Sequence, residues 1–485
     1  MKNEPLIGPD IPTGLYINGQ FRDASDGGKF DVYDPATEQV LASVADGTIA
    51  DAQAAVDAAA AAFPGWAART PRERGEILRK CFDLFSAQKE KFARLMTLEN
   101  GKSLTDARGE AAYAAEFFRW YAEEAPRNIG EVSKAPASGA RILVQHKPAG
   151  VAVLVTPWNF PAAMGTRKIA PALAAGCTVV LKPASETPLT MLALAKLFEE
   201  AGVPKGVVNI LPSRKSGAVV GHMLKDPRVR VISFTGSTEV GRKLLHAAAD
   251  QVVTPAMELG GNAPFIVFED ADIDAAVEGA MIAKMRNGGE ACTAANRFYI
   301  HEKVHDSFVE KFAAKMKGLK VGNGLEDGVG LGPLVNAETR DKVAHLVEDA
   351  VKRGAKVVTG GKRPDGKGFF YLPTVLTDVP DNAECLHDEI FGPVAPVQKF
   401  KTEDEAIKRA NATEYGLVCY VYTKDLSRGL RVSEKLETGM VGLNRGLVSD
   451  PAAAFGGVKQ SGLGREGAHE GMMEFLETQY ISAVW

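Results

Sequence analysis

Apolar positions recur along this chain with two different spacings, which together predict alternating helices and strands. Residues 50–63 and 71–99 repeat apolar side chains every three or four positions, with charged residues between them, which is typical of amphipathic helices. Later apolar runs are short and rich in β-branched residues, which predicts strands. These strand-like runs are 151–155, 178–181, 207–211 and 229–234, and then a second series at 264–268, 297–300, 394–400 and 418–422.

The order of these elements predicts the fold class. Each strand of the first series precedes a segment with helical spacing, and alternation of strand and helix is typical of parallel sheets in α/β proteins. We therefore predict a Rossmann-type region built from the first series, with the early helices 50–63 and 71–99 covering one face of a sheet. The second series predicts a second α/β domain, which contains Cys292.

A single thiol behind a pair of glycines is the most informative local feature, in the run Arg286–Phe298 (RNGGEACTAANRF). Gly288 and Gly289 allow backbone conformations that other residues resist, so a loop here can bring Cys292 close to a ligand. Thiols are the best side-chain nucleophiles for a carbonyl near neutral pH, because a few per cent is already thiolate. The alternative is a buried structural cysteine, which is the usual role of a free cysteine. We interpret Cys292 as a nucleophile.

Two further polar groups end strand-like or apolar runs and complete a candidate catalytic set. Glu258 ends an apolar run directly before Gly260 and Gly261, and it is a candidate general base. Asn159 ends the run that begins at Val153, and its amide can donate a hydrogen bond to a developing oxyanion.

Composition excludes several function classes. With 485 residues and 45% hydrophobic content the chain can bury large cores and divide into two or more domains. The net charge of −4, without a basic run that has interleaved aromatics, excludes a nucleic-acid-binding protein. The longest uncharged stretch, 169–181, contains Pro171 and Gly176 and is shorter than the roughly 20 apolar residues of a membrane helix. We expect a small-molecule partner.

The terminus, the cysteines and one histidine pair add negative predictions. Residues 1–14 lack a basic region followed by an apolar core, so we expect a cytoplasmic protein without a secretory signal. The odd number of widely spaced cysteines argues against a disulfide framework: 81, 177, 292, 385 and 419. His301 and His305 have zinc-protease spacing, but the predicted helix begins only near Val304, so we predict no metal site.

The chain resembles the NAD(P)-dependent aldehyde dehydrogenases over nearly its full length. The resemblance rests on these residues and on motifs from Tyr16-Ile-Asn-Gly to Phe455-Gly-Gly-Val-Lys-Gln-Ser-Gly. The resemblance implies that family's fold, with an atypical Rossmann cofactor domain, an α/β catalytic domain and a small bridging segment that extends a neighbour's sheet in a homodimer or homotetramer. The implied boundaries are 1–124 and 146–257 for the cofactor domain, 258–443 for the catalytic domain, 125–145 and 468–485 for bridging, and 444–467 for a substrate loop that returns to the cofactor domain.

The resemblance also implies the cofactor site. The turn after 229–234 has Thr238 where the usual dinucleotide fingerprint has its middle glycine, yet the helix start at Ser237 still suits an anion. Ser185 stands where a glutamate would repel a 2′-phosphate, which favours NADP, whereas an inward-pointing Glu186 would weaken that preference and leave NAD as the alternative. The implied cofactor residues are Thr156, Pro157, Trp158, Lys182, Ser185, Gly236, Ser237, Gly241, Leu259, Glu389 and Phe391.

The mechanism implied by the resemblance begins with addition of the Cys292 thiolate to an aldehyde, while Asn159 holds the oxyanion. Hydride transfer to the nicotinamide then leaves a thioester, which a water activated by Glu258 hydrolyses to the acid. Within the family the resemblance is greatest to succinate semialdehyde dehydrogenases, whose carboxylate-binding positions are matched by Arg167, Arg286 and Ser449. Alternatives are oxidation of glutarate semialdehyde, a broad aldehyde specificity, and a non-catalytic binding protein that keeps the fold.

Overall fold

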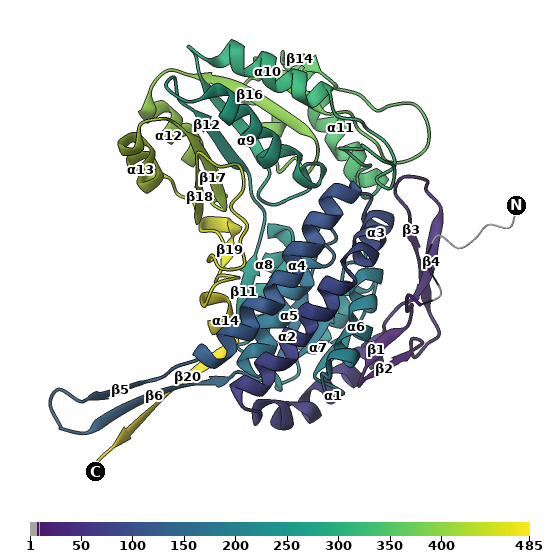
Figure 1. Ribbon diagram of the computed structural model, residues 1–485, viewed down its shortest axis with the longest axis vertical. Coiled ribbons are helices and arrows are strands. Elements are labelled where there is room, and N and C mark those ends of the chain that lie inside the picture. Colours follow the sequence, from purple (N-terminus) through teal and green to yellow (C-terminus); the bar gives the residue numbers. More distant parts are fainter. Residues whose placement is uncertain (1–6, 9) are drawn as a thin grey trace, which may run out of the picture.

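The computed structural model describes residues 7–8 and 10–485, so half of the segment assessed for a secretory signal, residues 1–6 and 9, lies outside the described residues. The chain forms two large sheets, each covered by helices on both faces, and two small sheets (Figure 1). The α-helices are α1 (Ile49–Ala67), α2 (Pro71–Ala87), α3 (Lys89–Asn100), α4 (Leu104–Glu124), α5 (Ala163–Ala175), α6 (Leu189–Ala201), α7 (Ser216–Leu224), α8 (Thr238–Ala249), α9 (Ile273–Met285), α10 (His305–Lys317), α11 (Ala337–Lys352), α12 (Glu403–Asn411), α13 (Leu426–Lys435) and α14 (Glu470–Met473). Short 3₁₀ helices are η1 (Ala125–Arg127), η2 (Arg286–Gly289), η3 (Glu384–Leu386) and η4 (Lys459–Ser461).

The first large sheet has eight strands in the order β19-β11-β10-β7-β8-β9-β1-β2. Its strands are β1 (Leu15–Ile17), β2 (Gln20–Arg22), β7 (Val151–Val155), β8 (Thr178–Lys182), β9 (Val208–Ile210), β10 (Val229–Thr235), β11 (Thr254–Glu258) and β19 (Gly462–Leu463). The central strands β7 to β11 run parallel to one another, and β7, β8, β9 and β10 are each followed by a helix, as predicted. The carboxyl ends of these strands therefore lie at one edge, where ligands of open α/β sheets usually bind.

Helices cover both faces of this sheet. One core joins strand residues such as Leu154 and Leu181 to α2 to α6, and the other joins Val153 and Val180 to α1, α7 and α8. The predicted single helix 71–99 is two helices, because Gln88 leaves the helical conformation (φ −107°, ψ 11°). The break lets Phe85 and Phe92 stack in the same core with their ring centroids 4.4 Å apart.

The second large sheet has seven strands in the order β14-β15-β16-β13-β12-β17-β18. Its strands are β12 (Ala263–Val267), β13 (Ala295–His301), β14 (Lys356–Thr359), β15 (Thr374–Thr377), β16 (Val394–Phe400), β17 (Val418–Tyr422) and β18 (Met440–Leu443). The four strands predicted for this region are confirmed as β12, β13, β16 and β17. His301 ends β13 and His305 begins α10, so the two histidines do not share a helix.

Three strands form a separate sheet that projects from the rest of the molecule (Figure 1). They are β5 (Glu131–Lys134), β6 (Arg141–Pro148) and β20 (Leu476–Ala483), in the order β20-β6-β5. β6 runs three residues beyond the implied boundary at residue 145. A fourth sheet pairs β3 (Lys29–Tyr33) with β4 (Val40–Ala45). The implied domain division and the bridging role of these strands stay predictions. In the described part of the chain, no helix combines the length and apolar character needed to cross a membrane.

Candidate active site

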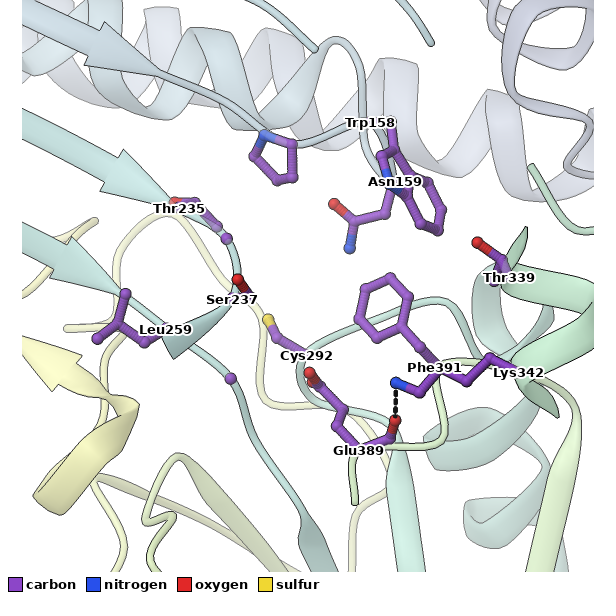
Figure 2. A pocket seen from close by; sticks show the side chains of 13 residues that line it. Trp158, Asn159, Thr235, Ser237, Leu259, Cys292, Thr339, Lys342, Glu389 and Phe391 are labelled. Carbon is purple, nitrogen blue, oxygen red and sulfur yellow. Dashed lines mark hydrogen bonds between the residues drawn. The ribbon is translucent and has the colours of Figure 1, made fainter. Parts of the chain in front are cut away.

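A cavity of about 340 Å³ opens where the carboxyl ends of the first sheet face the second sheet, and Cys292 lies in its wall (Figure 2). Residues after β7, β10 and β11 supply one side, and α11 and the segment before β16 supply the other. The lining residues are Pro157, Trp158, Asn159, Thr235, Gly236, Ser237, Leu259, Gly260, Cys292, Thr339, Lys342, Glu389 and Phe391. Nine of these lining residues, including Glu389 and Phe391, are ones that the sequence assigned to the cofactor or to catalysis.

The loop that carries Cys292 depends on three consecutive residues with left-handed backbone. Asn287, Gly288 and Gly289 have φ angles of 57°, 63° and 81°. A Cβ on Gly289 would lie 2.3 Å from the carbonyl oxygen of Gly392, so only glycine fits there without a shift. The predicted use of the glycine pair is confirmed, whereas the matching conformation of Asn287 was not predicted.

Cys292 is partly exposed to the cavity and is not disulfide-bonded. Burial in its surroundings raises the pKa of the thiol to about 12, an effect that Arg167 opposes and that Glu389 and Glu258 add to. The nucleophile needs a base, or a positively charged ligand, before it can react at neutral pH.

Asn159 points into the same cavity as Cys292 (Figure 2). Its side-chain Nδ2 donates to the carbonyl oxygen of Glu290 at 3.0 Å, which leaves one N–H for a ligand. Its own carbonyl accepts from Lys102 Nζ at 2.7 Å, and Lys102 forms a buried ion pair with Glu110. Asn159 is thus fixed from both its main chain and its side chain.

Glu258 ends β11 and is only 4% exposed. Desolvation and the nearby Glu466 carboxylate raise the pKa of Glu258 well above its ordinary value, against the opposing effect of Arg167 and Lys168. One of its oxygens, Oε2, has no hydrogen-bond partner among the described residues. Glu258 does not line the cavity itself, yet its charge is close enough to act on Cys292.

The turn after β10 has the features of an anion-binding helix start. Ser237 caps the 12-residue helix α8, and both Gly236 and Ser237 line the cavity. Gly241 lies outside the cavity, where a Cβ would come within 2.4 Å of the Leu259 side chain. The missing middle glycine of the fingerprint therefore does not prevent close packing of this helix against the loop after β11.

The opposite wall is aromatic and acidic. Trp158 and Phe391 meet edge to face, with ring centroids 5.3 Å apart and an interplanar angle of 90°. Burial raises the pKa of Glu389 to about 7, although the Gly261 N–H donates to its carboxylate at 3.2 Å. Lys342 Nζ donates to the Glu389 carbonyl at 2.6 Å, the contact drawn in Figure 2.

Thr339 and Lys342 are lining residues that the sequence did not reveal. Both lie on α11, which has the spacing of an ordinary amphipathic surface helix, and no motif marks them.

Lys182 ends β8, and Ser185, three residues later, lines a second cavity of about 210 Å³. Lys182 is 5% exposed and has no ion-pair partner among the described residues, and burial lowers the pKa of its amine to about 8. Thr156 is also buried, and its N–H donates to the Lys182 carbonyl at 3.2 Å. Ser185 donates its hydroxyl to Glu186 at 3.3 Å, and both line this cavity with Arg214.

The groups at these two cavities fit a dinucleotide. A buried ammonium without a counterion requires an anion, a helix N-terminus attracts phosphate, and flat aromatic walls accept a ring. Lys182, Ser237 and Phe391 supply these three features. The Ser185 hydroxyl, which was predicted to donate to a 2′-phosphate, donates instead to the Glu186 carboxylate.

Arg286 and Ser449 meet in a third cavity, of about 220 Å³. Arg286 Nη1 donates to Ser449 Oγ at 3.2 Å, and the guanidinium lies 4.9 Å from the ring centroid of Phe160, the residue after Asn159. Tyr113 also lines this cavity. Arg286 forms no ion pair among the described residues, although Asp106 and Glu110 line the same cavity.

Arg167 does not line this third cavity. It is 3% exposed, its Nε lies 2.5 Å from Glu466 Oε2, and its guanidinium lies 4.2 Å from the Phe455 ring centroid. Its Nη2 is buried without a hydrogen-bond partner among the described residues. Arg167 is therefore ion-paired with Glu466, while its Nε and Nη2 form no hydrogen bond among the described residues.

Comparison with known proteins agrees with this arrangement. The sequence profile described as "Aldehyde dehydrogenase family" matches residues 21–481. The chain belongs to the aldehyde dehydrogenase family. Members of this family use NAD(P) to oxidise aldehydes, so the chain is an oxidoreductase, and its α/β fold is the one that the sequence predicted.

Several characterised relatives are similar over almost their full length. The chain is 58% identical to a succinate-semialdehyde dehydrogenase of Paenarthrobacter nicotinovorans, covering 91% of this chain and 98% of the relative. It is 50% identical to a glutarate-semialdehyde dehydrogenase of Pseudomonas aeruginosa, covering 96% of each. Among solved structures, an NADP-dependent enzyme of E. coli superposes with a TM-score of 0.97 at 48% identity, covering 98% of this chain and 99% of that one.

Proposed function

We propose that this aldehyde dehydrogenase oxidises succinate semialdehyde to succinate. The single observation that supports this substrate best is Arg286, a guanidinium without an ion-pair partner among the described residues, in a cavity beside the loop that carries Cys292. A substrate with an aldehyde at one end and a carboxylate at the other supplies both the electrophile for Cys292 and the anion for Arg286.

Three features make Arg286 suitable for a carboxylate. Its planar guanidinium matches the geometry of a carboxylate better than an ammonium does. Ser449 Oγ, 3.2 Å from Nη1, holds one edge of the fork and can turn its own hydroxyl to the ligand. Arg167, close enough to Tyr113 to act on its pKa as Arg286 does, has a buried Nη2 without a hydrogen-bond partner among the described residues and is a candidate second donor. We propose that these three residues select acidic aldehydes.

Catalysis in this proposal begins at Cys292. Its sulfur adds to the aldehyde carbon and forms a thiohemiacetal, while the remaining N–H of the Asn159 amide and the Cys292 main-chain N–H stabilise the oxyanion. Because burial raises the pKa of the thiol to about 12, Glu258, whose own pKa is raised, is the group that can accept the thiol proton. When bound, the nicotinamide accepts a hydride at C4, which supplies the oxidation.

Glu258 acts again in the second half of the reaction. The acyl group remains attached to Cys292 as a thioester, and a water must lose a proton to attack it. A carboxylate with a raised pKa is a stronger base than an ordinary glutamate, so the burial of Glu258 suits this role. The products are succinate and the free thiol.

We propose NADP as the preferred cofactor and NAD as a second one. Lys182, a buried amine without an ion-pair partner among the described residues, supports binding of the 2′-phosphate. The hydrogen bond from Ser185 to Glu186 supports some use of NAD, because a carboxylate there can accept from a 2′-hydroxyl and repels a 2′-phosphate. Arg214, on the same cavity, offsets part of that repulsion.

The proposal is tested by initial rates of NADPH and NADH formation from succinate semialdehyde, glutarate semialdehyde and hexanal, with Cys292→Ala as the blank. We expect the highest kcat/KM for succinate semialdehyde with NADP. A higher value for glutarate semialdehyde would support the second candidate, which the Pseudomonas aeruginosa relative favours. Equal rates for hexanal would contradict the carboxylate site, and no reduction with any aldehyde would indicate a binding protein.

We also propose that the protein is a homodimer or homotetramer. The three-stranded sheet of β5, β6 and β20 projects from the body, and its strand β5 is exposed at every residue (Figure 1). Open sheet edges of this kind usually pair with another chain. Light scattering tests the assembly, and a monomer at micromolar concentration would contradict it.

A further inference from the structure

Asn287 adopts a backbone conformation that glycine would accept more easily. Its φ of 57° and ψ of 34° are left-handed, the two following residues are glycines with positive φ, and its side chain is only 1% exposed. Asparagine tolerates this region better than most residues, but glycine has no penalty there at all. The backbone alone therefore does not explain an asparagine at this position.

The side chain of Asn287 joins two segments that come from different sheets. Its Nδ2 donates to the carbonyl oxygen of Asn159, after β7, and to the carbonyl oxygen of Glu290, in the loop before β13, both at 2.9 Å. Cys292 lies two residues after Glu290. The two hydrogens of one amide thus tie the segment with the oxyanion donor to the segment with the nucleophile.

The contacts around this link make it specific. The Glu290 carbonyl accepts from both Asn287 Nδ2 and Asn159 Nδ2, the latter at 3.0 Å, so it holds the side chain of Asn159 as well as the loop. The Asn159 carbonyl accepts from Asn287 and from Lys102 Nζ. Removal of the Asn287 amide therefore frees one attachment of Asn159 and one attachment of the Cys292 loop at the same time.

We infer that Asn287 is a positioning residue that sets the separation between the Asn159 amide and the Cys292 sulfur, and so builds the oxyanion site. The inference rests on the proposed catalytic roles of those two residues. Displacement of a catalytic group by about 1 Å, or loss of one oxyanion donor, typically lowers the rate by about 100-fold or more. The effect belongs to the chemical step, because Asn287 lines none of the three cavities described above.

The test compares Asn287→Gly, which keeps the left-handed backbone and deletes both links, with Asn287→Asp, which turns the donor into an acceptor that faces two carbonyls. Asn18→Gly is the matched control, since Asn18 is also left-handed (φ 52°) but is exposed in the turn between β1 and β2. We expect Asn287→Gly to lower kcat by roughly 10- to 100-fold, with KM and the NADP dissociation constant within about threefold of wild type. Asn18→Gly should match wild type.

A double-mutant cycle with Asn159→Ala separates positioning from a general effect on folding. If Asn287 acts through Asn159, Asn287→Gly should reduce kcat by less than about twofold further in the Asn159→Ala background. Fully additive losses, or a kcat for Asn287→Gly within twofold of wild type, would overturn the inference. If Asn287→Gly has a lowered unfolding midpoint, the kcat values of Asn287→Asp in the wild-type and Asn159→Ala backgrounds are compared in its place.

Failure of the inference and failure of the proposed function give different results. Cleavage of p-nitrophenyl acetate requires attack by a thiol and stabilisation of an oxyanion but no hydride transfer and no substrate carboxylate. Loss of that cleavage in Asn287→Gly supports the inference even if wild type prefers another aldehyde. Unchanged ester cleavage would contradict it, whatever the aldehyde specificity.

Discussion

Replacement of Arg286 by methionine should remove the preference for acidic aldehydes. Methionine keeps the length and much of the apolar contact with Phe160 but removes the hydrogen bond to Ser449 and the positive charge. A hydrogen bond to a charged group contributes about 1.5–3 kcal/mol when it is buried. Because Arg286 is partly exposed, we expect about 2 kcal/mol, which is about a 30-fold lower kcat/KM for succinate semialdehyde.

The assay measures kcat/KM for succinate semialdehyde and hexanal in the same preparation, so that any loss of folded enzyme cancels in the ratio. The kcat/KM for hexanal should change by no more than about twofold, because hexanal has no carboxylate that Arg286 could bind. Arg286→Lys should give an intermediate loss, because it keeps the charge without the fork. Arg72→Met, at an exposed i,i+4 ion pair on α2, is the control. An unchanged substrate ratio in Arg286→Met would refute the carboxylate site.

Four further predictions concern the catalytic residues, the cofactor site and the buried Lys102–Glu110 ion pair. Alkylation of Cys292 by iodoacetamide in the free enzyme should rise about tenfold per pH unit up to the alkaline limit of stability, because burial raises the pKa of the thiol to about 12. The rate of thioester hydrolysis should increase as the pH passes the raised pKa of Glu258, because the carboxyl group stays protonated to a higher pH than an ordinary glutamate. In stopped-flow measurements, Glu258→Gln should abolish that increase. Lys182→Met should weaken NADP binding by calorimetry about tenfold and NAD binding much less. Lys102→Met should destabilise the protein by about 3–5 kcal/mol in urea unfolding, because it leaves Glu110 as an unpaired buried charge, whereas Lys102→Met with Glu110→Gln should recover part of that loss.

The strands that position the site could be predicted because they are buried on both faces. β7 and β12 are short apolar runs without polar interruptions, and such runs differ clearly from the helical spacing around them. The elements missed were those whose burial depends on tertiary packing. β5 and β20, for example, are almost fully exposed and carry no apolar periodicity.

The site could be predicted where a reactive side chain lies next to residues that favour an unusual backbone conformation. Cys292 was identified because its thiol is chemically distinctive and stands behind two glycines, and both glycines have the positive φ that the sequence suggested. Thr339 and Lys342 were missed because they are ordinary polar residues on a surface helix until that helix faces the cavity.

Electrostatic properties were the least predictable. The raised pKa of Cys292 results from burial by segments far away in the sequence, which no local motif encodes. The same holds for the hydrogen bond from Ser185 to Glu186, since the direction of a side chain after a strand is set by its neighbours in space.

The most direct test of the central claim is intact-mass and peptide-mapping analysis of Glu258→Gln after a single turnover with succinate semialdehyde and NADP. The incubation is made at alkaline pH, where part of the Cys292 thiol ionises without a base, so that the variant can form the thioester but lacks the base that hydrolyses it. The account predicts a succinyl group on the peptide that contains Cys292, formed together with one equivalent of NADPH. Cys292→Ala should carry no such group. NADPH formation without an acyl group on Cys292, or an acyl group on another residue, would contradict the account.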